Sequence, residues 1–204
     1  MKKSWNEITI DEFVQIQDSY KDADMTDEDR TLNLVYLLTN QDPMDMEFTE
    51  FQKVLKQLQF IKEEVPANPL KRRYELNGKK YRLMQSIDKI STAQYIDYTN
   101  HLKNMEDDVD YVNVLSVFIL PEDATKYNDG YDIETVKKDI RYYMPITDAL
   151  GIFRFFFHYY KNFIEISLRF LTKRLKKMKR KMKKETEEYR NMEKVIKTLG
   201  ELRV

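Results

Sequence analysis

Residues 73–83 read RYELNGKKYRL and form the clearest local pattern in the chain. Polar and apolar side chains alternate on both sides of Asn77 and Gly78, which is typical of two half-buried strands. An Asn-Gly pair between alternating runs predicts a type I′ turn, because both central residues of that turn need positive φ. We therefore predict one small β-hairpin over about residues 72–84.

The composition of the whole chain predicts that the remainder is helical. Of the 204 residues, 42% are hydrophobic and 34% are charged, with only four Gly and five Pro. A fold built from strands alone needs more turn residues, so this balance favours a mainly α class. The chain has no Cys, which excludes disulfides, thiolate metal sites and a Cys nucleophile.

Three helices are expected before the hairpin. Thr9 and Glu12 have the spacing of a capping box, which predicts a helix over about residues 10–20. Thr26 precedes three acidic residues and predicts the start of a second helix. A third helix is predicted after Pro43 by apolar residues that recur at spacings of three and four, namely Phe48, Phe51, Val54, Leu55 and Leu58.

Further helices are expected after the hairpin. Ser91 and Gln94 form a second capping-box pattern, which predicts a helix to about Asn104. The apolar run 112–120 indicates a central buried helix, with a buried strand as the alternative because of its β-branched content. Asp132 is a predicted cap for a short helix that ends near Tyr143.

From Thr147 to Gly200 the sequence contains no helix breaker. The stretch predicts one helix of roughly 50 residues and about 80 Å. We therefore predict an acidic helical body with the hairpin over residues 1–148, and a long basic C-terminal helix over residues 149–204. The body has 19 Lys+Arg and 29 Asp+Glu, whereas the second part has 16 and 6. Such a division indicates contact between molecules or between domains.

The distal part of this predicted helix has a heptad pattern. A repeat held over this many turns predicts a coiled coil with a second helix, either from another copy or from another protein. The alternatives are an isolated helix in solvent and a helix folded back on its own body. The predicted partner-binding seam consists of Leu168, Leu171, Leu175, Met178, Met182, Tyr189, Met192, Ile196 and Leu199.

Positive charge is concentrated in the same region, and none of residues 169–184 is acidic. We expect an acidic partner, which is either a protein surface, such as the body of another copy, or nucleic-acid phosphates bound without sequence specificity. The alternative is an ordinary solvated helix face. The predicted basic patch consists of Lys173, Arg174, Lys176, Lys177, Lys179, Arg180, Lys181, Lys183 and Lys184.

An aromatic belt lies at the start of the long predicted helix. Consecutive aromatic residues cover every face of a helix, so the belt is either core packing or a protein–protein interface. The residues that we assign to this predicted aromatic interface are Phe153, Phe156, Phe157 and Tyr160.

The sequence contains little that could support catalysis. His101 and His158 are the only histidines, and no phosphate-binding Gly-rich loop or nucleophile elbow is present. We therefore expect no enzymatic activity, no cofactor or metal and no small-molecule substrate. The start of the chain has no apolar signal region, and no run of 18 apolar residues occurs, so we expect no membrane association and a cytoplasmic location.

Several segments taken together resemble a family of known proteins. They are WNEITI at 5–10, NGKKY at 77–81, STAQYID at 91–97, YNDGYD at 127–132 and MPITDALG at 144–151. Over about residues 4–165 this series resembles the tail assembly chaperones, or tail and baseplate-hub assembly proteins, of tailed bacteriophages that infect Bacteroides-like hosts. The basic stretch from about residue 169 to 204 is an addition to that pattern.

The resemblance implies a non-enzymatic protein of virion assembly, without a cofactor, that binds other phage structural proteins in the host cytoplasm. Its expected place of action is the tail or portal region. The added basic helix indicates an alternative, which is a structural or packaged protein retained in the virion, where this helix contacts other subunits or DNA. A third hypothesis is a nucleic-acid-binding protein that uses the basic helix as a tether.

Overall fold

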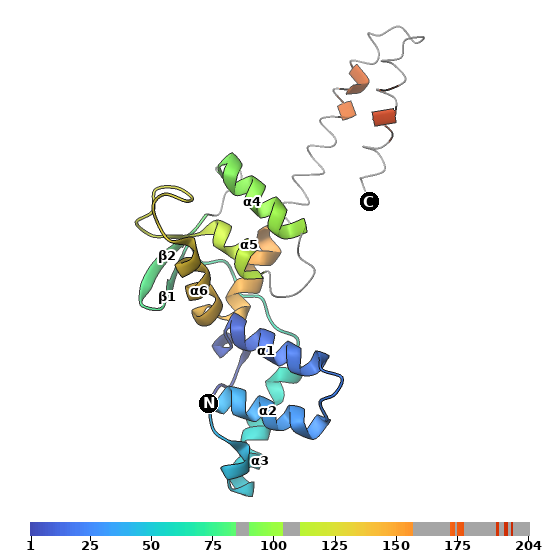
Figure 1. The fold of residues 1–204 in the computed structure, drawn as a ribbon, viewed down its shortest axis with the longest axis vertical. Helices are drawn as coiled ribbons and strands as arrows, with labels where there is room; N and C mark the ends of the chain where they lie inside the picture. Colours follow the sequence, from blue (N-terminus) through green and yellow to red (C-terminus); the bar gives the residue numbers. More distant parts are fainter. Residues whose placement is uncertain are drawn as a thin grey trace. The chain divides into compact units, whose positions relative to one another are not determined.

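The computed structural model describes residues 1–84, 90–103 and 111–156, together with residues 172, 173, 175–177, 191, 194, 195 and 197. The chain divides into two units, Met1–Arg154 and Phe155–Val204. Unit 1 is mainly helical with one small antiparallel sheet, as predicted for the body (Figure 1). Most of the predicted coiled coil lies outside the described residues.

The order of elements in unit 1 agrees with the helices predicted from the sequence. Short 3₁₀ helices precede α1 and lie on either side of α3. The helical elements are η1 (Trp5–Glu7), α1 (Ile10–Lys21), α2 (Asp27–Thr39), η2 (Pro43–Asp45), α3 (Phe48–Gln57), η3 (Leu58–Lys62), α4 (Thr92–Lys103), α5 (Tyr111–Phe118) and α6 (Ile133–Tyr143). Residues 146–156 are also helical.

The helix caps predicted from the sequence are present. The Thr9 hydroxyl accepts a hydrogen bond from the Glu12 amide, and the Glu12 carboxylate accepts one from the Thr9 amide. Thr26 caps α2 with its hydroxyl. The Ser91 amide donates to Gln94 Oε1 at 3.0 Å, while the Gln94 amide donates to Ser91 Oγ at 3.2 Å. Each pair satisfies amides that the first helical turn leaves without a partner.

The hairpin is confirmed. Strand β1 (Arg73–Leu76) pairs antiparallel with β2 (Lys79–Leu83). The turn residues Asn77 and Gly78 have φ angles of 52° and 68°, as a type I′ turn requires. The alternating side chains place one face of each strand in the core and leave the other in solvent.

A third strand was not predicted as part of the sheet. Strand β3 (Ile119–Pro121) follows α5 directly and pairs antiparallel with β2, with Leu83 opposite Ile119. The apolar run 112–120 therefore contains both a helix and a strand: the predicted helix ends at Phe118, and the strand that was its alternative begins at Ile119. The run is buried on every side, so neither the helical nor the strand period was visible in it.

The core of unit 1 is centred on α5 and β3. Helices α4 and α6 both pack against α5, and α1 packs against α6 and α2. The ring of Tyr98 on α4 meets Phe118 edge-on, with 5.0 Å between the ring centroids. Leu115, Val117 and Phe118 are completely buried. This run therefore connects the sheet with the helices around it.

The first residues of the chain pair with a segment far along the sequence. The Ile10 amide donates to the Met144 carbonyl at 3.2 Å, and the Ile146 amide donates to the Ile8 carbonyl at 2.8 Å. The extended backbone after α6 is thereby held beside the start of α1. At this point the two extended segments satisfy each other's backbone amides and carbonyls with hydrogen bonds, as buried polar groups require.

The loop before the hairpin crosses the helix over residues 146–156. The Asn68 amide donates to the Thr147 carbonyl at 2.9 Å, and Asn68 Nδ2 donates to Asp148 Oδ1 at 2.7 Å. Lys71 Nζ lies 2.7 Å from Asp148 Oδ2. A Cβ atom placed on Gly151 would lie 2.1 Å from the Asn68 carbonyl oxygen. Glycine is thus required at residue 151 by the close backbone approach.

We predict that Gly78→Val lowers the free energy of unfolding by about 1 kcal/mol or more, because a β-branched residue at positive φ is strained. No neighbouring atom lies within 4 Å of a Cβ at this position, so the cost reports backbone conformation alone. Urea unfolding measures the change. The control is Lys80→Val on the exposed side of β2, which should have little effect; equal stability of Gly78→Val and the parent would contradict the turn.

We predict that Gly151→Ala costs about 1–3 kcal/mol for a different reason, which is overpacking against the Asn68 backbone. Thermal unfolding of the variant and the parent measures this cost. Gly130→Ala is a useful comparison, because Gly130 has a φ of 75° but open space around it. A Gly151→Ala variant that melts like the parent would show that the loop does not cross the helix at this distance.

Candidate functional site

A buried carboxylate joins the hairpin to α6. Asp139 is only 3% exposed and accepts three hydrogen bonds from the hairpin. The donors are Asn77 Nδ2 at 3.0 Å, Lys79 Nζ at 2.8 Å and the Tyr81 hydroxyl at 2.5 Å. The four side chains converge because the type I′ turn presents one end of the sheet to the buried face of α6. This arrangement satisfies the carboxylate and fixes the hairpin.

Electrostatics agree with a structural role for this cluster. Burial by itself would raise the pKa of Asp139, but the hydrogen bonds from Lys79, Tyr81 and Asn77 and the charge of Lys79 outweigh it, so the pKa lies below its ordinary value of 3.8. Burial and the hydrogen bond to Asp139 raise the pKa of Tyr81. Asp139 therefore stays charged and Tyr81 neutral near pH 7, which is unsuited to proton transfer between them.

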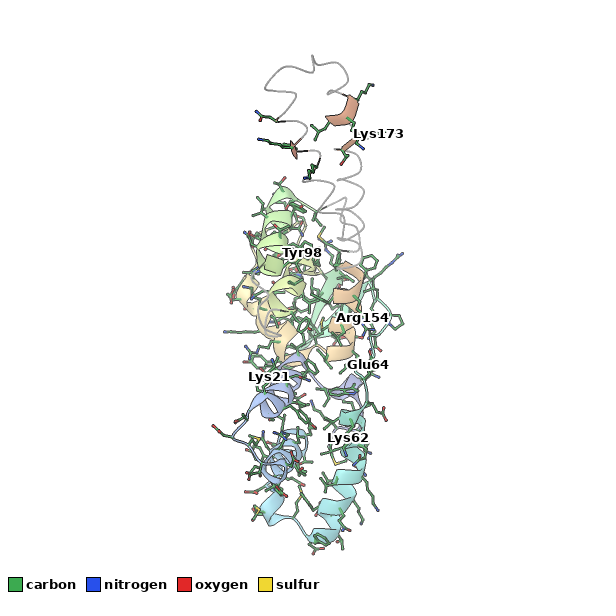
Figure 2. The ribbon with its side chains drawn as sticks, turned by 90° about the vertical axis from the view of Figure 1, so that its right-hand side faces the viewer. Lys21, Lys62, Glu64, Tyr98, Arg154 and Lys173 are labelled. Atoms are coloured by element: carbon green, nitrogen blue, oxygen red, sulfur yellow. The ribbon has the colours of Figure 1, made fainter. Side chains whose placement is uncertain are left out.

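A second feature is an arm of unit 1 formed by residues 22–62, which include α2, η2, α3 and η3. The arm is attached to the rest of unit 1 by packing of α2 on α1 and by contacts close to residue 62. Trp5 Nε1 donates to the Glu63 carbonyl at 3.2 Å, and the Trp5 ring packs edge-on against Phe60. Figure 2 shows Glu64 beside Arg154, and the two charged groups are 3.5 Å apart.

The apolar face of α3 is only partly covered. Phe48, Phe51, Leu55 and Leu58 follow one another at spacings of three, four and three, so they share one side of the helix. Leu58 is 7% exposed, Phe51 and Leu55 are half-buried, and Phe48 is 71% exposed. The stripe is thus buried at the end of α3 and exposed at its start. Helix α3 is the lowest labelled helix of unit 1 in Figure 1.

A hollow lies where the covered part of this stripe meets the first two helices. Its volume is about 210 Å³, and Leu55 and Leu58 line it together with Leu34 and Tyr20. The hollow is too small for a typical drug-sized ligand, whose pockets are about 300–1,000 Å³. The stripe therefore offers an extended apolar surface and not a binding cavity.

Carboxylates flank the exposed end of the stripe in the sequence. Met44 in η2 is 77% exposed, four residues before Phe48. Four acidic residues, all exposed, precede, separate and follow these two apolar residues along the chain. We define the arm tip as Asp42, Met44, Asp45, Glu47, Phe48 and Glu50.

Acidic residues outnumber basic ones in the part of the arm before residue 51. Residues 22–50 contain nine acidic side chains, all exposed, and a single cation, Arg30. Arg30 is half-buried and already occupied, since it pairs with Asp27 at 2.6 Å and donates to two backbone carbonyls. In the part of the chain that the structure describes, Asp45, Glu47 and Glu50 form no salt bridge. The arm tip therefore combines four exposed carboxylates with two exposed apolar side chains.

Few of the site residues predicted from the sequence lie among the described residues. Of the predicted seam only Leu175 is described, and it is half-buried. Of the basic patch, Lys173, Lys176 and Lys177 are described, and all three are exposed. The remaining seam and basic-patch residues lie outside the described residues, as do Phe157 and Tyr160 of the predicted aromatic interface.

The two described members of the aromatic interface differ. Phe153 is half-buried, and its ring meets Tyr111 edge-on with 5.1 Å between centroids. Phe156 is 1% exposed and its ring meets Phe155 edge-on.

Sequence reasoning missed both features of this site, although signals for them exist. Asp139 stands in the buried stripe of α6 between Val136 and Ile140, where a carboxylate needs hydrogen-bond donors. Phe48 entered the prediction only through the apolar spacing of the third helix, and its exposure was not predicted. The dense carboxylates on both sides of Met44 were the available sign that this stretch faces solvent.

Comparison of the chain with protein-family models, with curated proteins and with solved structures finds no match. Within the described residues, no group of three or more His, Cys, Asp or Glu side chains is placed to hold a metal ion. No described helix combines the length and the apolar character that a membrane crossing needs.

We predict that Asp139→Asn lowers the free energy of unfolding by about 2 kcal/mol at pH 7, because charge-assisted hydrogen bonds to a buried group are lost. Because the pKa of Asp139 in the folded state lies below the ordinary 3.8, the charged carboxylate stabilises the fold above about pH 4. This stabilisation is lost as the pH falls through the pKa of the folded state. The difference between variant and parent should therefore shrink below about pH 4. Urea unfolding between neutral and acidic pH measures this difference in the free energy of unfolding.

The matched control for this prediction is Glu134→Gln, also on α6. Glu134 is 65% exposed and pairs with Lys137 on the surface, so its replacement should change stability by less than about 0.5 kcal/mol. A pH-independent cost for Asp139→Asn would show that packing, and not the charge of Asp139, holds the hairpin on α6.

Proposed function

We propose that this chain is a non-enzymatic assembly protein of a tailed bacteriophage, and that it works by binding other structural proteins of the tail or portal region. The observation that carries the proposal is the arm tip, where Met44 and Phe48 are 77% and 71% exposed among carboxylates. Large apolar side chains exposed to solvent are characteristic of protein–protein contact sites, and aromatic anchors with a polar rim dominate such contacts.

The resemblance of residues 4–165 to phage tail assembly proteins supports the biological setting. Two of the resembling segments have structural roles, since NGKKY supplies the turn and the donors to Asp139, while MPITDALG contains Thr147 and Gly151 at the Asn68 crossing. These segments maintain the body that carries the arm. The proposed site of action is the host cytoplasm during particle assembly.

A second function is favoured by one feature of the sequence, the absence of acidic residues from 169 to 184. In this alternative the protein is a structural or packaged component of the virion, and its basic C-terminal part forms a coiled coil or contacts other subunits or DNA. Mass spectrometry of purified particles separates the two functions, because an assembly chaperone leaves the particle and a structural component remains in stoichiometric amount.

The test of the proposed function is the double substitution Met44→Ser and Phe48→Ser, introduced into a phage that carries this gene. Both side chains are exposed, so the free energy of unfolding should change by less than about 0.5 kcal/mol. Loss of two interface anchors should weaken partner binding by roughly 30-fold, equivalent to about 2 kcal/mol. The yield of complete tailed particles, counted by electron microscopy, should fall accordingly.

The control for this test is Tyr143→Ser, which removes a 50% exposed aromatic side chain on α6 and should leave particle yield unchanged. Normal assembly by the Met44 and Phe48 variant would contradict the proposed function of the arm tip.

A further inference from the structure

The arm tip limits the chemistry of what it can bind. It contains two apolar side chains, Met44 and Phe48, that are both more than two-thirds exposed. Its four charged residues are all acidic, and Arg30, the one cation of residues 22–50, is occupied within the arm. A complementary partner must therefore present apolar side chains flanked by Lys or Arg, since like charges across an interface are strongly disfavoured.

A segment of this same chain has that chemistry. Residues 169–184, here called the basic segment, contain ten Lys and Arg and no acidic residue. Leu171, Leu175, Met178 and Met182 recur within it at spacings of four and three, the pattern of one apolar stripe of a helix. The described positions agree, because residues 172, 173 and 175–177 are helical, and Lys173, Lys176 and Lys177 are exposed.

We propose that the arm tip binds the basic segment of a second copy of this chain. The inference rests on the proposed function of the arm tip as a protein-binding surface and names its partner. Each copy has one acidic tip and one basic segment, so a two-fold pair can make the same contact twice. Two simultaneous contacts reinforce each other by raising the effective concentration of the second, which favours a second copy over a foreign helix with a single contact.

The division of charge in the chain supports this pairing. The chain has 35 basic and 35 acidic residues, so its net charge is zero. Long-range repulsion between two copies is therefore small, while opposite charges at the tip and the segment attract each other and orient the encounter. Methionine side chains at positions 178 and 182 adapt to irregular apolar surfaces, as contact with Met44 and Phe48 requires.

The experiment uses the full chain and two charge-reversed variants. The tip variant carries Asp45→Lys, Glu47→Lys and Glu50→Lys. The segment variant replaces all seven lysines of the basic segment by glutamate, which gives that segment a net negative charge; the substitutions are Lys173→Glu, Lys176→Glu, Lys177→Glu, Lys179→Glu, Lys181→Glu, Lys183→Glu and Lys184→Glu. Circular dichroism and thermal unfolding establish that each variant is folded. Sedimentation equilibrium from about 1 to 100 μM measures association of each protein alone and of the two variants mixed.

The parent should form dimers in this range, and its dissociation constant should rise with salt, because exposed charge pairs are screened within about 10 Å at 0.1 M salt. Each variant alone should bind itself at least about tenfold more weakly. The mixture should associate again, because the reversed tip of one variant meets the reversed segment of the other. A protein that carries both reversals should dimerise like the parent.

Three results would overturn the inference. A parent that is monomeric at every concentration excludes the second copy as partner. Association that survives reversal of the tip places the contact elsewhere in the chain. Variants that are monomeric alone and remain so when mixed exclude a contact between the tip of one copy and the basic segment of the other.

The serine variant gives an independent check that does not depend on charge reversal. Met44→Ser with Phe48→Ser should weaken self-association, whereas Asp123→Lys, at an exposed carboxylate outside the arm, should not. Equal association of the serine variant and the parent would also overturn the inference. If the protein does not self-associate but the serine variant still lowers particle yield, the inference fails and the proposed function is retained. The two failures can therefore be told apart.

Discussion

Every side chain from Val114 to Leu120 is buried, and the organisation of unit 1 depends on this constraint. A continuous apolar run of this kind must be covered on all sides, because each exposed apolar side chain would lose transfer free energy. Helices α4 and α6 cover the helical part, and β2 pairs with its extension as β3. The change from helix to strand at residue 119 lets one segment serve both the helical layer and the sheet.

Polar contacts then determine how the covering elements are oriented. Apolar packing is not directional, whereas a buried carboxylate accepts hydrogen bonds only from donors at defined positions. Asp139 orients the hairpin on α6, and Asp148 with Asn68 orients the preceding loop on the helix over residues 146–156. Within the described residues, no buried side-chain nitrogen or oxygen atom lacks a hydrogen-bond partner. These two carboxylates are accordingly structural.

In the arm, by contrast, some large apolar side chains are left exposed. Its cover decreases along α3 from the buried Leu58 to the exposed Phe48, and acidic side chains increase in number where apolar cover is lost. Carboxylates keep such a surface soluble and oppose its contact with other acidic surfaces, while the apolar centre remains available to a basic partner. Such a surface attracts basic partners and repels acidic ones before apolar side chains come into contact.

The sequence by itself determined the features that depend on neighbouring residues. The capping pairs Thr9 with Glu12 and Ser91 with Gln94 are three residues apart, and the turn at Asn77 and Gly78 needs only its own backbone, so local patterns predicted all of them. Tertiary structure alone decided the pairing of β3 with β2, the donors to Asp139 and the exposure of Phe48. Each of these depends on which distant segments come together, and the free energy of that packing overrides local preference.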